Sequence, residues 1–279
     1  MLICGTRSSL VSIDKSSRLI VAGIILFLIA KILKIASTAP AAPSKCPIED
    51  FVDDIEIEQA KKDLDARSFR QEYEATWEVY SGIVMHSFSM EHNVKNISVP
   101  DDVTTYHLGM VFNLDPLCAT VSYIKDNVVY VFDEIQIWSS NTDELCQEIH
   151  RRYPGIKIFV YPDPASRQRK TSAGGRTDLS ILQNAGFICK VPTRHMAVRD
   201  RINSVNAKLH SASGHRGIYI HPKCKNLLNS ISKHTYKEGT VLPDKTQGLD
   251  HMTDAIGYKI SFLYPVSYTH LTLPTNREV

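Results

Sequence analysis

Residues 106–137, YHLGMVFNLDPLCATVSYIKDNVVYVFDEIQI, decide the fold. Three of their segments, 106–112, 119–124 and 128–137, are rich in β-branched and aromatic residues, which favour strands. Only Lys125, Asp126 and Asn127 separate the second segment from the third, and a connection this short joins antiparallel neighbours. The stretch therefore predicts a three-stranded antiparallel meander.

Helical and strand patterns alternate after the meander. The patterns predict helices at 141–153, 177–185, 198–210, 224–234 and 249–263, with short strands at 157–161, 187–191 and 218–221. Asn141 and Glu144 have the spacing of a capping box, which supports the first helix. A meander followed by β/α units and closing helices is the order of an RNase H-like fold. We therefore expect an α/β protein, in which a mixed sheet of antiparallel meander and parallel strands is flanked by helices.

Both ends of the chain differ from this body. Residues 1–44 are an atypical apolar and linker-like N-terminus, and residues 19–36 are a marginal candidate for a membrane helix. The apolar run Leu19–Ala30 is shorter than the ~18 residues of a span, so we expect no membrane tether. Residues 45–80 have the pattern of one or two surface helices, and residues 81–266 form the predicted α/β domain. Residues 267–279 read as a tail outside the fold.

The composition, 43% hydrophobic and 22% charged, is that of a globular chain and does not point to one function. The cysteines at positions 4, 46, 118, 146, 189 and 224 have no zinc-binding spacing, which indicates reduced and mostly buried thiols. The formal net charge is only +2, but residues 164–225 hold twelve Lys or Arg against Asp178 and Asp200. A basic segment of this kind favours a polyanion such as duplex DNA. The alternative is an ordinary solvated basic face.

Three acids are candidates for metal-dependent cleavage of phosphodiesters. That reaction needs carboxylates that converge from separate elements to hold two divalent ions, Mg²⁺ or Mn²⁺. Asp163 follows the predicted strand 157–161 at its carboxyl end, where open α/β sheets place their sites. Its alternative is a turn residue between two prolines.

Asp250 and Asp254 are four residues apart at the start of the last predicted helix and therefore share one face. For Asp250 the alternative is a helix cap. Asp254 borders an apolar stripe that includes Ile256 and Ile260, where an unpaired charge is costly. This position favours a ligand role for Asp254. His251 is a weaker candidate, with a solvent-facing histidine as the alternative.

A resemblance rests on six strings that occur in order along the chain. They are DARSFRQEYEA (65–75), YPDPA (161–165), KTSAGG (170–175), RDRINSVN (199–206), TYKEG (235–239) and DHMTDA (250–255). Together they resemble the large terminase subunit of tailed phages, over its C-terminal RNase H-like nuclease domain. The resemblance implies that residues 81–266 are this domain and that residues 45–80 match the end of the ATPase domain. By position it also implies that Asp163 and Asp254 are nuclease carboxylates, with help from Asp250.

The chain departs from the family at the first strand. Where the family has Gly-Met-Asp-Phe-Asn, residues 109–113 read GMVFN, so Val111 replaces the expected metal-bridging Asp. Asp115 is four residues further on, ~13 Å along a strand, which is too far for a two-metal site. Glu134, near the end of the third strand, is a candidate metal ligand that partly compensates. Its alternative is a strand-end acid paired with a nearby Arg or Lys.

The loop that follows Asp163 supplies the candidate DNA contacts. Its pair of glycines permits close approach of the backbone to phosphate. Arg199 and Arg201 have an alternative role as structural partners of Asp200 or of the site carboxylates. The DNA-binding residues predicted from the loop are Arg167, Arg169, Lys170 and Arg176.

The resemblance implies an endonuclease that cuts concatemeric double-stranded viral DNA during genome packaging, in the host cytoplasm. It also implies the small terminase subunit and the portal protein as partners in the full motor. The sequence contains no G-x-x-x-x-G-K-[ST] loop, so we expect no ATP site in this chain. Two alternatives stay open. One is a catalytically impaired DNA-binding remnant, argued by Val111, and the other is a membrane-tethered protein, argued only by residues 19–36.

Overall fold

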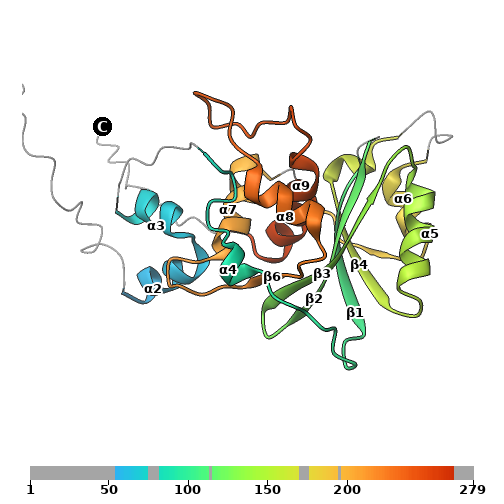
Figure 1. Cartoon of the computed structure of the whole chain (residues 1–279), viewed down its shortest axis with the longest axis horizontal. Coiled ribbons are helices and arrows are strands. Elements are labelled where there is room, and N and C mark those ends of the chain that lie inside the picture. Colours follow the sequence, from blue (N-terminus) through green and yellow to red (C-terminus); the bar gives the residue numbers. More distant parts are fainter. Residues whose placement is uncertain (1–53, 75–81, 113–114, 170–175, 194–195, 267–279) are drawn as a thin grey trace, which may run out of the picture. The chain divides into compact units, whose positions relative to one another are not determined.

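The computed structural model describes residues 54–74, 82–112, 115–169, 176–193 and 196–266. Within these residues, a six-stranded mixed sheet organises the fold (Figure 1). Its strand order is β5-β4-β1-β2-β3-β6. The strands are β1 (Thr105–Val111), β2 (Leu117–Lys125), β3 (Val128–Ile137), β4 (Lys157–Pro162), β5 (Ile188–Cys189) and β6 (Ile218–Ile220).

The predicted meander is confirmed, because β2 pairs antiparallel with both β1 and β3. Asp126 and Asn127 connect β2 to β3 with φ values of 51° and 61°. Asn and Asp tolerate this left-handed region better than most residues, so the tight turn follows from the sequence. On the outer sides of the meander, β4 pairs parallel with β1 and β6 pairs parallel with β3. The predicted α/β fold with an RNase H-like mixed sheet is therefore confirmed.

Helices cover both faces of this sheet (Figure 1). One face packs against α5 (Thr142–Arg152) and α6 (Asp178–Asn184), with Leu145, Ile149 and Leu182 buried there. The other face packs against α7 (Val198–Leu209), α8 (Lys225–Lys233) and α9 (Asp250–Leu263). Because successive side chains of a strand point to opposite faces, the central strands β1, β2 and β3 contribute apolar side chains to both cores.

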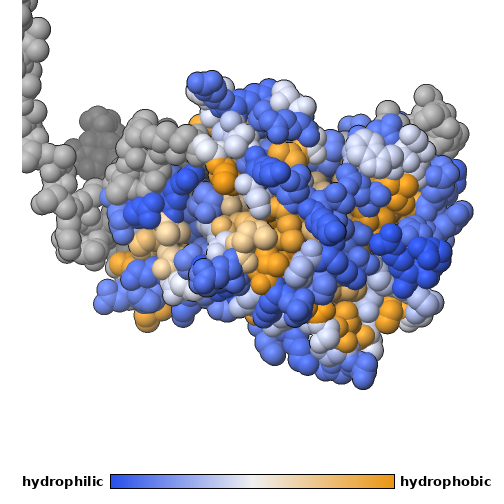
Figure 2. Space-filling view, viewed as in Figure 1, coloured by the Kyte–Doolittle hydropathy of each residue, from blue (hydrophilic) through white to orange (hydrophobic). Residues whose placement is uncertain are grey.

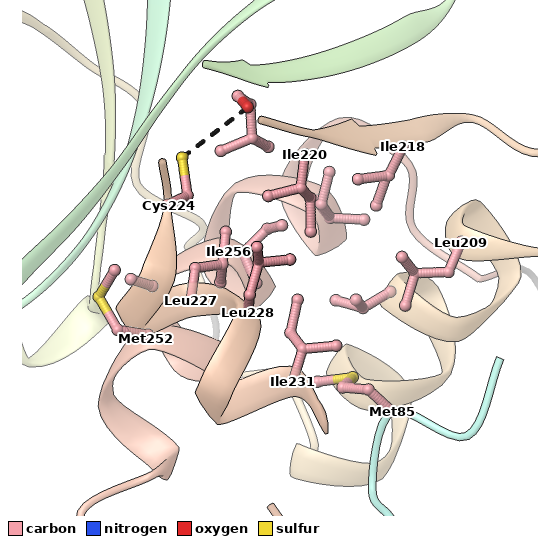
Figure 3. Close-up of a cluster of buried hydrophobic side chains, with 14 of the residues drawn as sticks. Met85, Leu209, Ile218, Ile220, Cys224, Leu227, Leu228, Ile231, Met252 and Ile256 are labelled. Carbon is pink, nitrogen blue, oxygen red and sulfur yellow. Dashed lines mark hydrogen bonds between the residues drawn. The ribbon is translucent and has the colours of Figure 1, made fainter. Parts of the chain in front are cut away.

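The core on the α7–α9 side holds Ile218 and Ile220 of β6 against Leu227 of α8 and Ile256 of α9 (Figure 3). The buried thiol of Cys224 points to the carbonyl oxygen of Val131, at 4.0 Å. Cys118 and Cys146 are also buried free thiols, and Cys189 is half-buried. The prediction of reduced, mostly buried cysteines holds for these four, whereas positions 4 and 46 lie outside the described residues.

Local sequence signals explain most of the element ends. The Asn141 side chain caps α5 by accepting the Glu144 N–H at 3.0 Å. The reciprocal half of the capping box differs, because the Glu144 carboxylate accepts the Ser140 hydroxyl instead. The strand predicted at 187–191 is wrong in length, since only the two residues of β5 pair with β4. Two short helices, α4 (Met90–Asn93) and η2 (Pro164–Arg167), were not predicted.

The helices predicted before the α/β domain are α2 (Asp54–Asp63) and α3 (Ala66–Tyr73). They are tied to the loop after α7 by backbone hydrogen bonds from Ala212 N–H to Leu64 and from Ser213 N–H to Lys61, both 2.8 Å. The proposed boundary at residue 80 falls within residues 75–81, which lie outside the described part. The membrane-helix candidate at residues 19–36 and the tail 267–279 also lie outside it.

The face shown in Figure 2 is largely hydrophilic, with separate hydrophobic patches. Scattered exposed apolar side chains are normal for a folded domain. Among the described residues, the large hydrophobic side chains with the highest exposure include Ile55, Trp138, Val241 and Leu242. No helix in the described part of the chain has the length and apolarity that a membrane span requires.

Candidate metal centre

Asp163 lies at the carboxyl end of β4, next to the end of β1. The parallel register pairs Met110 with Pro162, and the Asp163 N–H continues the ladder by donating to the Met110 carbonyl at 3.1 Å. The half-buried Asp163 side chain accepts the Ala165 N–H at 2.9 Å and so begins η2. Asp163 thus shows both features that were weighed from the sequence. It lies in the turn predicted from its flanking prolines, and it stands at the strand end where a site residue was expected. In this ladder, Val111 is the neighbour of Asp163.

α9 crosses β1 at Gly109. A Cβ atom at Gly109 would lie 2.0 Å from the Ala255 carbonyl oxygen, so only glycine allows this close approach. Val111 is two residues further along β1 and therefore points to the same face. It is 4% exposed and packs in the core that contains Met252 and Ala255. The first two turns of α9 consequently lie over the end of β1, near the position where the resemblance expects a carboxylate.

Asp254 is paired with a buried arginine of α7. Arg201 Nη2 donates to Asp254 Oδ1 at 2.6 Å, and the exposed fractions of the two side chains are 8% and 19%. Burial raises the pKa of Asp254, and the Arg201 charge opposes this rise. Of the two arginines weighed from the sequence, Arg201 pairs with a site carboxylate, whereas Arg199 pairs with Glu72 at 3.2 Å.

Asp250 is 5% exposed and does not cap α9. Its Oδ2 lies 3.7 Å from the Lys245 ammonium, and its Oδ1 lies 3.6 Å from His251 Nδ1. Among the described residues, Oδ1 has no hydrogen-bond partner. A buried carboxylate oxygen without a donor is costly and fits a cation better than an apolar neighbour. Because its side chain makes no capping hydrogen bond to α9, the helix-cap alternative for Asp250 is wrong.

Glu134 has a structural role that the sequence did not indicate. Its Oε1 accepts the backbone N–H and the side-chain amide of Asn226, both at 2.9 Å, and its Oε2 accepts the Leu227 N–H at 2.8 Å. Residue Cys224, which precedes α8, forms no side-chain cap in the described part. Glu134 therefore caps α8 from a neighbouring strand. In the described part of the chain its carboxylate binds these N–H groups and not the Arg or Lys of the alternative interpretation, whereas Arg152 donates to the Glu134 backbone carbonyl at 3.1 Å.

The acids present fit a metal only in part. No three His, Cys, Asp or Glu side chains of the described residues are grouped so that they could hold a metal ion. Asp163, Asp250 and Asp254 offer the carboxylate oxygens that Mg²⁺ and Mn²⁺ prefer, and Asp250 has an oxygen to spare. Val111 occupies the position beside Asp163 where the family would add a further carboxylate.

The four predicted DNA contacts differ in their surroundings. Arg167 is exposed, yet its guanidinium donates to the Pro192 and Val191 carbonyls at 2.8 and 3.2 Å. Arg176 pairs with Asp143 at 3.3 Å. Arg169 is exposed, and Lys170 lies outside the described residues. Arg167 therefore fixes its own loop, whereas Arg169 remains a prediction for phosphate contact.

Tyr258 is a site residue that the sequence reasoning missed. Burial raises the pKa of Tyr258, and the negative charges of Asp163 and Asp254 add to this rise, whereas the Arg201 charge opposes it. Tyr258 is four residues after Asp254, so the helical spacing alone placed it on the same face. His234 is likewise buried beside this helix, with Nδ1 3.0 Å from the Thr253 hydroxyl.

No protein-family model and no curated protein matches this sequence. Solved structures do match. The large terminase of a thermophilic bacteriophage, in complex with ATP-γ-S, aligns with a TM-score of 0.59 and 18% identity, over 76% of this chain and 53% of that one. The chain thus spans about half the length of that protein.

Two nuclease domains also align. That of the P22 large terminase has a TM-score of 0.51 and 15% identity, over 66% of this chain and 94% of the domain. That of the bacteriophage SPP1 large terminase, with bound Mn, has a TM-score of 0.42 and 12% identity, over 60% of this chain and 95% of the domain. By its similarity to the thermophilic-phage protein and the P22 domain, the described part of this chain has the fold of the large terminase nuclease domain.

Proposed function

We propose that residues 81–266 are the nuclease domain of a phage terminase large subunit, which cuts concatemeric double-stranded viral DNA during packaging. The observation that carries the proposal is the placement of Asp163 at the end of β4, beside β1, with α9 and its two acids crossing at Gly109. Asp163 at a strand end and the two acids at the start of α9 therefore lie toward the carboxyl edge of the sheet, where open α/β sheets place their sites. Carboxylates from separate elements on this edge support a role in metal-dependent phosphodiester cleavage.

Asp163, Asp254 and Asp250 would hold Mg²⁺ or Mn²⁺, and Glu134 would serve only if it left the α8 N-terminus. A pair of such ions activates water and stabilises the leaving oxygen. Other residues of the chain would bind the DNA and orient it. Arg169, Lys170 and Arg176 would bind phosphates of the duplex and orient it, while Arg167 holds the loop that carries them.

Val111 favours a second candidate, a catalytically impaired DNA-binding remnant of the same domain. The valine side chain is buried against Met252 and Ala255, so it provides packing where a carboxylate is expected. In that case the phosphate contacts persist while cleavage is lost. Salt-sensitive DNA binding without cleavage would support this candidate, since binding through phosphates weakens as salt rises.

In the full motor, the partners would be the small terminase subunit and the portal protein, in the cytoplasm of the infected host. The ATP-driven step would come from elsewhere, because the sequence contains no phosphate-binding loop for ATP.

The test is plasmid cleavage by the full chain in Mg²⁺ or Mn²⁺, as it is and with Val111→Asp. Asp163→Ala and Asp254→Ala are made in whichever form cuts. Asp102→Ala is the matched control, because Asp102 is an exposed acid paired with Lys125 at 3.2 Å, away from the site. We expect both site variants to abolish cleavage and the control to retain it.

If only the Val111→Asp form cuts, the site is correct and the chain is an impaired copy. If both forms cut, Asp250 or Glu134 completes the site without residue 111. If neither form cuts or binds DNA, or if Asp163→Ala and Asp254→Ala cleave normally, the nuclease proposal is wrong.

A further inference from the structure

A polar pocket of about 260 Å³ lies between the end of β3 and the first turns of α8 and α9. Its lining includes Gln136 of β3, Asn229 of α8 and Gln247, which precedes α9. Gln136 is two residues after Glu134, so it points to the same face of the sheet as the cap of α8. Trp138 directly follows β3, lines the same pocket and is 63% exposed. Pockets for drug-sized ligands measure ~300–1,000 Å³, so this one suits a single flat ring system.

The backbone on both sides of Trp138 is held in place. β3 ends at Ile137, which pairs with Leu117 of β2. On the other side, the Ser139 N–H donates to the carboxylate of Asp115, which is itself a lining residue. A fixed segment therefore carries the indole ring at the pocket, and most of the ring surface is open to a ligand.

The side-chain amides of the pocket have no partner within the described part of the chain. Those of Gln136, Asn229 and Gln247 form no hydrogen bond there. Each amide has both a donor and an acceptor, and such a pair matches the edge of a nucleobase, adenine in particular. An aromatic ring such as that of Trp138 adds a stacking surface, which accepts every base.

The charges near the pocket disfavour a phosphate as its ligand. Asp115 lines the pocket, and the buried Asp250 comes directly before the lining residue His251. The N–H groups at the start of α8 are already bonded to Glu134. The lining contributed by described residues contains no Lys or Arg. The pocket therefore suits an uncharged ring with donors and acceptors on its edge.

We propose that this pocket binds one unpaired base of DNA, with the base stacked on Trp138 and its edge bonded to the amides of Gln136 and Asn229. The inference rests on the proposed function only in naming DNA as the source of the base. Bases inside a duplex are stacked and paired, so the bound base comes from a strand end, a bulge or an extruded nucleotide.

The position of the pocket gives this binding a consequence for the substrate. Met252 of α9 lines the pocket and also packs in the core that contains Val111, at the end of β1. The pocket is therefore adjacent to the edge of the sheet where the nuclease site is proposed. The domain accordingly prefers duplexes that present an unpaired base beside the cutting site.

The first experiment uses a nucleoside, because a ligand without phosphate does not engage the basic segment. The chain has two tryptophans, so Trp77→Phe leaves Trp138 as the single fluorescent indole. Deoxyadenosine is titrated into the full chain carrying Trp77→Phe. We expect saturable quenching of the emission, which Gln136→Ala and Asn229→Ala each weaken. Gln183→Ala is the matched control, because Gln183 is an exposed amide on α6, which covers the other face of the sheet.

The second experiment measures fluorescence anisotropy of a labelled blunt duplex and of the same duplex with one bulged adenine, in EDTA so that neither is cut. Stacking of one base on an aromatic ring corresponds to about 5–150-fold in affinity, and we expect Trp138→Ala to weaken binding of the bulged duplex by this factor. Trp138→Phe keeps a ring and should retain most of the affinity. The blunt duplex should bind equally to all three forms.

The outcomes separate this proposal from the proposed function. If both duplexes bind in a salt-sensitive manner and Trp138→Ala weakens neither, the base pocket is wrong and DNA binding through phosphates stands. Quenching by deoxyadenosine that rises linearly without saturation would also overturn the pocket. If deoxyadenosine saturates the pocket but neither duplex binds, the pocket is a nucleoside site, and DNA as the source of the base is wrong together with the nuclease proposal.

Discussion

Two acidic regions on the same face of the sheet have opposite surroundings. Glu134 on β3 receives three N–H groups at the start of α8. Asp250 at the start of α9 has a buried oxygen that no described residue reaches with a hydrogen bond. The difference shows that Glu134 stabilises the fold, and it favours Asp250 over Glu134 as a ligand in the proposed metal site. It also explains why a list of acids alone does not define a metal site.

The position of α9 over β1 is the feature that this comparison depends on most. We expect Gly109→Ala to destabilise the fold by roughly 3 kcal/mol, because its Cβ would collide with the Ala255 carbonyl and push α9 off β1. Chemical unfolding measures the loss. The control is Gly155→Ala, which meets no atom within 4 Å and has only its positive φ of 74° as a cost, about 1 kcal/mol. Equal losses for the two variants would contradict the close approach of α9.

Lys259 of α9 contacts the central strand β2. It is fully buried, and its Nζ donates to the hydroxyls of Ser122 and Thr120 at 2.9 and 3.2 Å. Burial lowers the pKa of Lys259 from 10.5 to about 7. Above pH 7 the unfolded chain therefore binds more protons than the folded chain, so stability rises with pH.

We expect the free energy of unfolding to increase by roughly 2 kcal/mol from pH 7 to pH 9 through Lys259, and this part of the increase to disappear in Lys259→Met. A smaller rise toward pH 9 should remain in the variant, because burial lowers the pKa of Lys208 to about 8. Two groups near Lys259 titrate outside this window. His107 has its pKa lowered to about 4 by burial and by Lys259, and the Cys224 thiol has its pKa raised to about 12 by burial. Denaturant midpoints across the pH range provide the measurement. A rise between pH 7 and pH 8 that is as large in Lys259→Met as in the unchanged chain would contradict the assignment to Lys259.

Removing the cap that Glu134 provides tests the structural role assigned to this acid in the comparison. Glu134→Ala leaves helix N–H groups without their acceptor, and we expect a loss of about 1–2 kcal/mol. Thermal unfolding measures it. Metal binding by a Val111→Asp host should be the same with and without Glu134→Ala. A weaker Mn²⁺ affinity in the Glu134→Ala variant would indicate that Glu134 is a metal ligand.

Asp250→Asn should have the smallest effect and the opposite sign. Without metal, the amide removes a buried negative charge that lacks a hydrogen-bond donor at Oδ1, so we expect a gain of about 1 kcal/mol or less. Asp102→Asn, an exposed acid, serves as the control and should leave stability unchanged within measurement. A clear loss of stability in Asp250→Asn would mean that the ionised carboxylate is structurally required.

Much of the fold followed from the sequence because its signals are local. Alternating β-rich runs and a short Asp126-Asn127 turn are sufficient for the meander, and Asn141 marks the start of α5. The four-residue helices α4 and η2 are too short to have a periodic pattern. The two-residue β5 depends on its pairing with β4, which no property of residues 187–191 reveals.

The site was only partly predictable for the same reason. The strand-end position of Asp163 and the shared face of Asp250 and Asp254 are local features and were predicted. The role of Glu134 was not, because α8 begins 91 residues later in the sequence (Lys225 minus Glu134) and its need for a cap is visible only in the fold. The choice of Arg201 over Arg199 as the partner of Asp254 likewise depends on the packing of α7 against α9.

Calorimetric titration of Mn²⁺ into the full chain, with Val111, Val111→Asp and Val111→Asn side by side, tests the central claim most directly. The two substitutions have nearly the same shape and differ in charge. If Asp163, Asp250 and Asp254 surround the position of Val111, Val111→Asp should bind Mn²⁺ clearly more tightly than the other two forms. Equal affinity of Val111→Asp and Val111→Asn would contradict a metal centre at this end of β1.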